Sequence, residues 1–292
     1  MSELNECSSS QLLEKLNSGE LSILRVLGAK RMKNEMIPPG LFCRALTNLV
    51  CLAKDDAKIK KRALKLLKIL TPLKTCSEFP KSDEAIVIGF NHPSLGEIFR
   101  LLIIAFESYP DREYLFPVNL PWYEAMTCII PKIEKLGIHI TPMVTPSTAA
   151  KLNALFSDDE EKLAQVQHIK NRFERRYMKL AGDCAEAGNI IFVAPSSTRQ
   201  EKVIGDHIHP TMTILAHMVC KKPDTKVQFI PTAVIKPKNG NRGINLFKTY
   251  MLSPCEPFKR PEVEALTNKS REFDLIFLQR IDSKYGEIGG KI

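Results

Sequence analysis

From residue 85 onward, short apolar runs alternate with longer amphipathic segments, and this alternation constrains the fold more than any other feature of the sequence. Short apolar runs bounded by turn residues predict strands, whereas apolar residues at three- and four-residue spacing predict helices. Alternating strands and helices are typical of an α/β domain built on one central sheet. The predicted strands cover residues 85–90, 114–118, 137–141, 189–194, 227–234 and, more weakly patterned, 244–250; the predicted helices cover residues 95–108, 121–135, 147–156, 159–187, 210–220 and 261–284.

The first 70 residues have a different pattern. Residues 10–70 carry apolar positions at helical spacing throughout, interrupted in the middle by Pro38, Pro39 and Gly40. The stretch TPLKTCSEFPKSD, residues 71–83, contains proline and serine with little periodicity and is therefore predicted to be a linker. We expect an α/β fold in two parts: a helical N-terminal domain, residues 1–78, and an α/β domain with a central mixed sheet, residues 79–292.

The chain is basic, with a net charge of +9 over 292 residues. The excess is concentrated at residues 54–68, 170–176 and 236–242. Such clusters attract nucleic acid, anionic lipid headgroups or an acidic protein, although each cluster can also be an ordinary solvated helix face. Aromatic residues are not interleaved with the charges, as they usually are in proteins that bind single-stranded nucleic acid, so we expect no nucleic-acid partner.

No apolar run approaches the roughly 20 residues that span a bilayer, and the N-terminus MSELNECSSSQLLEKL lacks the apolar segment of a secretory signal. We therefore expect a cytoplasmic protein, in which peripheral membrane contact could come only from basic and apolar surface patches. The eight cysteines include no CxxC pair, so no metal site is expected. Several cysteines, including Cys128 and Cys220, lie in apolar stretches and are predicted to be buried free thiols.

Residues 91–97, NHPSLGE, follow the first predicted strand and contain the strongest candidate for chemistry. Pro93 suits the first position of a helix and keeps His92 out of helical angles, so the imidazole can turn back toward Glu97 in the first turns. A carboxylate that binds one imidazole nitrogen fixes the tautomer and makes the other nitrogen a general base for a hydroxyl. The alternative is a capping histidine beside an unrelated surface glutamate. The location favours chemistry, because ligand sites gather at strand carboxyl ends.

A second polar segment follows another predicted strand in NIIFVAPSSTRQEK, residues 189–202. After Pro195 come three hydroxyl side chains and a guanidinium, and arginine binds phosphate oxygens with two parallel hydrogen bonds. This stretch predicts an anion-binding loop, with a polar turn and an exposed arginine as the alternative. The residues in question are Ser196, Ser197, Thr198 and Arg199.

Together these segments resemble the motifs of the glycerolipid acyltransferase superfamily over roughly residues 80–240. NHPSLGE is similar to the first block, His-x4-Asp, with Glu97 in place of aspartate. APSSTRQ keeps the proline, threonine and arginine of the third block, Phe-Pro-Glu-Gly-Thr-Arg, with Ser196 and Ser197 where glutamate and glycine stand. It resembles still more the Ala-Pro-Ser-Gly-Gly-Arg block of the soluble, plastid-type glycerol-3-phosphate acyltransferases, and IPTAV, residues 230–234, resembles the fourth block.

The resemblance implies an O-acyltransferase of phospholipid biosynthesis, with His92 and Glu97 as the catalytic pair. The donor would be an acyl thioester, acyl-ACP or acyl-CoA, used as co-substrate with no bound cofactor or metal. The acceptor would be glycerol 3-phosphate or, as the alternative, lysophosphatidate. Arg199 is the expected phosphate ligand, with Ser196, Ser197 and Thr198 beside it.

Two departures from the superfamily keep other interpretations open. The second block usually supplies an arginine, but LGIHITPMVTPST, residues 136–148, has none, and Lys151 is the nearest cation that follows. Lys151 is therefore a further candidate for binding substrate, and with the arginines within residues 172–176 it is a weaker one than Arg199. The altered blocks also leave open a non-catalytic relative that binds lipid or a carrier protein. The sequence determines neither the acceptor, the donor, the acyl chain length nor the oligomeric state.

Overall fold

The computed structural model describes residues 23–29, 56–93, 96–195, 210–240, 245–268 and 272–290. Of the helices predicted within residues 10–70, it describes α3 (Ile23–Val26) and α6 (Asp56–Leu70), and the rest lies outside the described residues. The α/β fold class with a central mixed sheet is confirmed. By internal contacts the chain forms two compact units: Met1–Ile59 with Pro117–Arg175, and Lys60–Phe116 with Arg176–Ile292.

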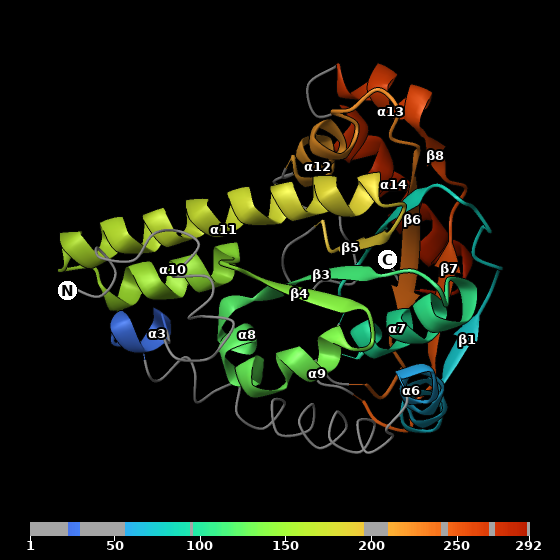
Figure 1. Ribbon diagram of the computed structural model, residues 1–292, viewed down its shortest axis with the longest axis horizontal. Coiled ribbons are helices and arrows are strands. Elements are labelled where there is room, and N and C mark those ends of the chain that lie inside the picture. Colours follow the sequence, from blue (N-terminus) through green and yellow to red (C-terminus); the bar gives the residue numbers. More distant parts are fainter. Residues whose placement is uncertain are drawn as a thin grey trace. The chain divides into compact units, whose positions relative to one another are not determined.

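The central sheet has eight strands in the order β1-β7-β6-β2-β5-β3-β4, and β8 pairs separately with β6 (Figure 1). The pairs β1–β7, β2–β5, β2–β6 and β3–β5 are parallel, whereas β6–β7 and β6–β8 are antiparallel. The strands are β1 (Leu73–Thr75), β2 (Ala85–Phe90), β3 (Tyr114–Asn119), β4 (Ile138–Met143), β5 (Ile190–Val193), β6 (Val227–Ile235), β7 (Tyr250–Pro254) and β8 (Phe258–Lys259).

Strand β2 lies in the middle of the sheet, between β5 and β6. Every residue of β2 and of β5 is buried, which explains why both sequences are continuous apolar runs rather than alternating ones. The register pairs Gly89 with Val193 on one side and with Pro231 on the other. The chain after β2 leads toward β3 on the β5 side, whereas the chain after β6 leads to β7 on the opposite side. Open α/β sheets bind ligands at the carboxyl ends of the strands, at the point where the connections leave in opposite directions.

The helices follow the predicted periodicity, with two corrections. The segment predicted as one helix over 121–135 is divided, because Pro131 has no N–H and its ring excludes a continuous helix. The segment predicted as one helix over 261–284 is likewise two helices. The bounds are α7 (Glu97–Ser108), α8 (Leu120–Met126), the 3-10 helix η1 (Thr127–Ile129), α9 (Ile130–Glu134), α10 (Pro146–Leu155), α11 (Glu160–Glu186), α12 (Thr211–Val219), α13 (Arg260–Thr267) and α14 (Glu272–Glu287).

Each unit has its own core. In the first unit, buried Leu24, Leu152 and Phe173 belong to a cluster drawn from α3, α10 and α11. In the second unit, α14 packs against β6, and α12, α13 and α14 contact one another (Figure 1). Phe258, Phe273 and Phe277 lie there in edge-to-face and stacked ring contacts with centroids 5.4–5.8 Å apart, a geometry that aromatic pairs favour.

Three further predictions need correction. The predicted linker contains strand β1, whose residues pair with β7 and therefore belong to the sheet. The predicted strand 244–250 is misplaced, since β7 begins at Tyr250. Cys128, predicted to be buried, is exposed in the short turn η1, although the described cysteines are free thiols as expected. The predicted domain boundary between residues 78 and 79 stays a prediction.

Candidate active site

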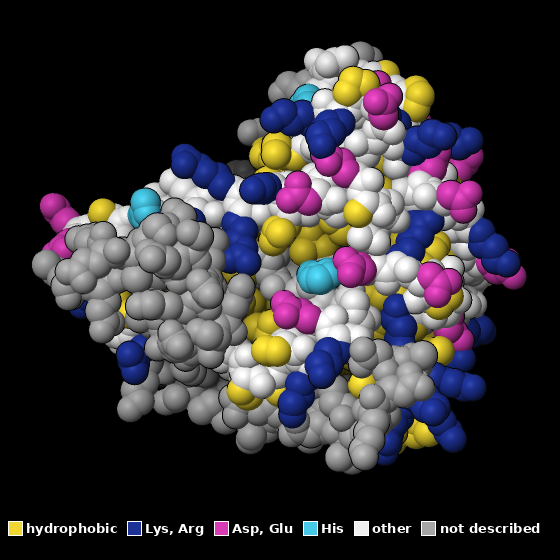
Figure 2. Space-filling view, in the orientation of Figure 1, with side chains coloured by type: hydrophobic (Ala, Val, Ile, Leu, Met, Phe, Trp, Pro, Cys, Tyr) yellow, Lys and Arg dark blue, Asp and Glu magenta, His cyan; other side chains and the backbone are white. Residues whose placement is uncertain are grey.

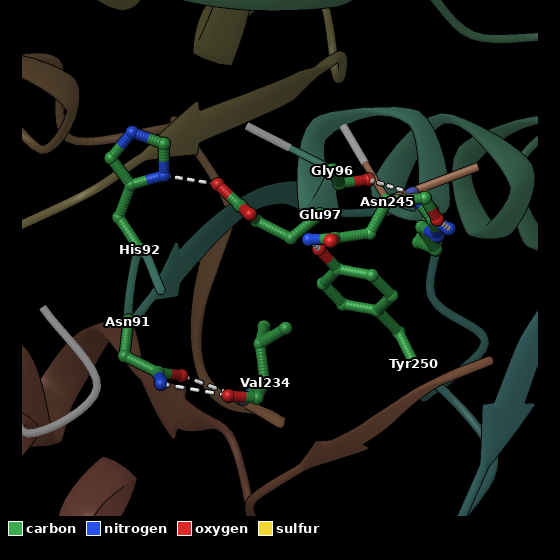
Figure 3. Close-up of polar contacts among 8 residues, drawn as sticks. Asn91, His92, Gly96, Glu97, Val234, Asn245 and Tyr250 are labelled. Atoms are coloured by element: carbon green, nitrogen blue, oxygen red, sulfur yellow. Dashed lines mark hydrogen bonds and ion pairs between the residues drawn. The ribbon is translucent and has the colours of Figure 1, made fainter. Parts of the chain in front are cut away.

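The candidate site lies in the second unit, where the chain leaves β2 and enters α7. The side chain of Asn91 continues the pairing between β2 and β6: its Nδ2 donates to the carbonyl of Val234 at 2.8 Å, and its Oδ1 accepts from the Val234 amide at 2.6 Å (Figure 3). Asn91 is fully buried. These two hydrogen bonds to β6 fix the backbone immediately before His92, so the imidazole starts from a defined position.

Helix α7 begins at Glu97, with Gly96 as its N-cap residue. Pro93 is therefore outside the helix, and the prediction that it occupies the first helical position is wrong. The consequence is that Glu97 is the first helical residue rather than one inside the first turns. A carboxylate there interacts favourably with the positive end of the helix dipole, and its side chain has no exposure to solvent.

His92 and Glu97 are in direct contact. The Nδ1 atom of His92 faces Oε1 of Glu97, and Figure 3 shows the other ring nitrogen turned away from the carboxylate. Because a carboxylate only accepts hydrogen bonds, Nδ1 is the donor in this contact, and in the neutral imidazole the lone pair then lies on Nε2. The His92 side chain is 18% exposed, whereas Glu97 is closed off from solvent. The pair thus leaves part of the imidazole accessible to solvent and keeps its orienting acid inside.

A buried arginine sits one helical turn after Glu97. Arg100 has no solvent exposure, and its guanidinium lies over the Tyr250 ring at 4.1 Å from the centroid. Nη1 donates to the carbonyl of Gly96 at 2.8 Å, and Nη2 donates to the carbonyls of Asn245 and Lys248, each at 3.0 Å. The guanidinium therefore connects the start of α7 to the turn 245–248.

The charge on Arg100 is retained despite this burial. Burial lowers the pKa of Arg100 from 12.5 to about 10, and interactions with Tyr250 and Glu97 offset part of that effect. The side chain is therefore protonated at neutral pH, and its positive charge lies near the Glu97 carboxylate. In Figure 3, Tyr250 lies below Asn245, whose Nδ2 donates to the tyrosine hydroxyl at 2.8 Å.

The other predicted site residues fall elsewhere. Ser196, Ser197, Thr198 and Arg199 lie outside the described residues, so the predicted anion-binding loop stays a prediction. Lys151 is on α10 in the first unit, where its side chain is exposed. Its role in binding substrate also stays a prediction.

The sequence reasoning missed Arg100 and Tyr250. One signal for Arg100 was present: an arginine three residues after Glu97 lies on the same face of a helix that is otherwise apolar. Tyr250 had no such signal, since its partner is far away in the sequence. Within the described ranges, no group of three or more His, Cys, Asp or Glu side chains could hold a metal ion. None of the described helices is both long and apolar enough to cross a membrane.

Comparison with known proteins finds a similar solved structure and no matching family. No protein-family model matches the sequence, and no curated protein matches it. Among solved structures, the chain is similar to the 1-acyl-sn-glycerophosphate (LPA) acyltransferase PlsC from Thermotoga maritima, with 13% sequence identity over 86% of this chain and 90% of that chain. The TM-score is 0.47, and from a match at this level we assign neither a family nor an activity.

Proposed function

We propose that this protein is an O-acyltransferase that moves an acyl group from a thioester to the hydroxyl of a phosphate-bearing acceptor. One observation carries the proposal: Nδ1 of His92 contacts the buried carboxylate of Glu97, so that in the neutral ring the lone pair lies on Nε2. This is the arrangement of a general base, and it lies at the carboxyl end of the central strand β2. The likeness of NHPSLGE to the His-x4-Asp block agrees with this assignment.

In the proposed mechanism, Nε2 of His92 accepts the proton of the acceptor hydroxyl as the oxygen attacks the thioester carbonyl. A C–O bond forms, and negative charge develops on the carbonyl oxygen. The intermediate then collapses, the C–S bond breaks, and the thiolate takes the proton back from His92. Glu97 stabilises the imidazolium between these steps, and a positioned base of this kind contributes about 10²–10⁴-fold in rate. No acyl group is attached to the protein.

For the acceptor we propose a glycerol phosphate, either glycerol 3-phosphate or its 1-acyl derivative. Arg199 would bind the phosphate, assisted by Ser196, Ser197 and Thr198, and Lys151 is a second candidate cation. The excess positive charge of the chain suits anionic substrates. The 1-acyl compound is also the substrate for which the similar solved structure is named, so both acceptors belong in the same assay.

The test is a released-thiol assay with acyl-CoA and acyl-ACP as donors and the two glycerol phosphates as acceptors. We expect acceptor-dependent thiol release by the wild-type protein and its loss in His92→Ala, with an unchanged circular dichroism spectrum. Equal activity of the wild-type protein and His92→Ala would overturn the proposed base. Arg199→Ala should mainly raise the KM of the acceptor, and a normal KM would move the phosphate site elsewhere.

A non-catalytic relative that binds lipid or a carrier protein is the second candidate. It is favoured by Ser196 and Ser197, which replace the glutamate and glycine of the third block. The same assay distinguishes the two, because such a protein would bind acyl-CoA or acyl-ACP without releasing thiol in the presence of any acceptor.

A further inference from the structure

Helix α6 has one buried face and one cationic face. Ile59, Ala63 and Leu67 recur at four-residue spacing and are each 3–4% exposed. On the opposite side Lys61, Arg62, Lys65 and Lys68 are exposed. Lys68 is paired with Glu107, but among the described residues no carboxylate forms an ion pair with Lys61, Arg62 or Lys65. Within the described part of the chain, Lys61, Arg62 and Lys65 are therefore not neutralised by an ion pair.

Two large apolar side chains are exposed at the C-terminal end of the same helix. Ile69 is 57% exposed and Phe247 is 68% exposed. The Phe247 amide donates to the carbonyl of Leu70 at 2.8 Å, which places the turn 245–248 against the end of α6, next to Ile69. We call Lys61, Arg62, Lys65, Ile69 and Phe247 the α6–turn surface.

The turn holds Phe247 outward in an unfavourable backbone conformation. Asn245 has a φ of 52° and Phe247 a φ of 58°, and the left-handed region costs a bulky residue on the order of 1 kcal/mol. The turn persists because the buried guanidinium of Arg100 binds the carbonyls of Asn245 and Lys248. A phenylalanine held in this way, without burial, is available for a contact outside the chain.

We propose that the α6–turn surface docks on an anionic lipid membrane. Cations at the membrane surface are attracted to anionic headgroups, and Phe247 and Ile69 can enter the boundary between headgroups and acyl chains. Nucleic acid would satisfy the cations but offers nothing to an aliphatic side chain such as Ile69. Figure 2 shows dark blue side chains gathered at the lower right, where Figure 1 places α6, with hydrophobic side chains among them. This proposal does not depend on acyl transfer.

The test is co-sedimentation of the full chain with phosphatidylcholine vesicles, with and without phosphatidylglycerol. We expect binding only to the anionic vesicles and weaker binding as salt is raised. Lys61→Ala and Lys65→Ala should each lower the partition coefficient about fivefold. In Phe247→Asn the new residue also tolerates the left-handed conformation, and the partition coefficient should fall about tenfold.

Matched controls use exposed residues on other helices of the second unit. Ile69→Gln should also weaken binding, and its control is Ile214→Gln on α12, where the side chain is 43% exposed. The control for the lysine variants is Lys179→Ala at an exposed position on α11. Both controls should bind like the wild-type protein. The proposal is overturned if the wild-type protein ignores anionic vesicles, if it binds duplex DNA in their place, or if the α6–turn variants bind as tightly as the controls.

Discussion

Replacing Arg100 by methionine should destabilise the second unit by about 3 kcal/mol. The substitution removes the donors for three carbonyls, those of Gly96, Asn245 and Lys248. The Gly96 bond is buried, and a buried acceptor that loses its donor costs about 1–3 kcal/mol. The other two bonds are partly buried, so water can replace the donor and each loss costs about 0.5–1.5 kcal/mol.

Two further effects enter the sum. Loss of the stacking of the guanidinium on Tyr250 adds about 1–2 kcal/mol. Burial of a charge is itself costly, as the lowered pKa of Arg100 shows, and the methionine variant is relieved of that cost. Methionine also refills the apolar part of the volume with a flexible side chain. The net effect of about 3 kcal/mol corresponds to a decrease in Tm of roughly 6 °C for a chain of this size.

The assay is thermal unfolding followed by circular dichroism, with two comparison variants. Tyr250→Phe keeps the ring beneath the guanidinium and removes only the hydroxyl that accepts from Asn245, so it should cost about 1 kcal/mol. Arg100→Lys keeps the charge but cannot reach three carbonyls at once, so it should fall between methionine and the wild type. A Tm for Arg100→Met within about 1 °C of the wild type would refute the inference that this guanidinium holds the turn to α7.

Three further predictions concern the residues around the candidate base. In Gly89→Ala the new Cβ would lie 2.5 Å from Cε1 of the buried Phe277, so the variant should lose about 2–3 kcal/mol of unfolding free energy. Adding Phe277→Leu to this variant should restore part of the stability, and equal Tm values for the single and double variants would contradict the predicted clash. Asn91→Leu leaves the amide and carbonyl of Val234 without their side-chain partners and should cost about 2–4 kcal/mol in urea unfolding, whereas an unchanged midpoint would mean that the two bonds contribute nothing. In the neutral form of the His92 ring, ¹⁵N NMR should show a protonated Nδ1 and an unprotonated Nε2, and the reverse tautomer would contradict the assigned pairing with Glu97.

The centre of the sheet was predictable because strands such as β2 and β5 are buried on both faces. The strand predicted at 85–90 matches β2, a continuous apolar run bounded by polar residues, and that at 227–234, which is mostly apolar, differs from β6 by one residue. β1 was missed because its three residues, LKT, are too few and too polar to form a pattern. β7 was misplaced because the apolar residues near 244–250 do not reveal where pairing with β6 begins.

The candidate site divides in the same way. Contact between His92 and Glu97 could be anticipated, because both residues lie within one short segment at the end of a strand and the proline sets the local conformation. The hydrogen bonds of Arg100 to the turn 245–248 could not, because the partners are 145 and 148 residues away and are backbone carbonyls, which leave no trace in a sequence. The two hydrogen bonds between Asn91 and Val234 could not be predicted from the sequence for the same reason.

The most direct test of the central claim is the turnover number of Glu97→Gln, measured in the released-thiol assay with the best donor and acceptor. Glu97 has no solvent exposure, so we expect it to act on the reaction by orienting His92 rather than by contacting a substrate. The amide keeps the size of the side chain but no longer favours the Nδ1–H tautomer or stabilises an imidazolium. We predict a fall of about 10²–10⁴-fold at unchanged acceptor KM and Tm. Wild-type turnover by Glu97→Gln would contradict the assignment of His92 and Glu97 as the catalytic pair.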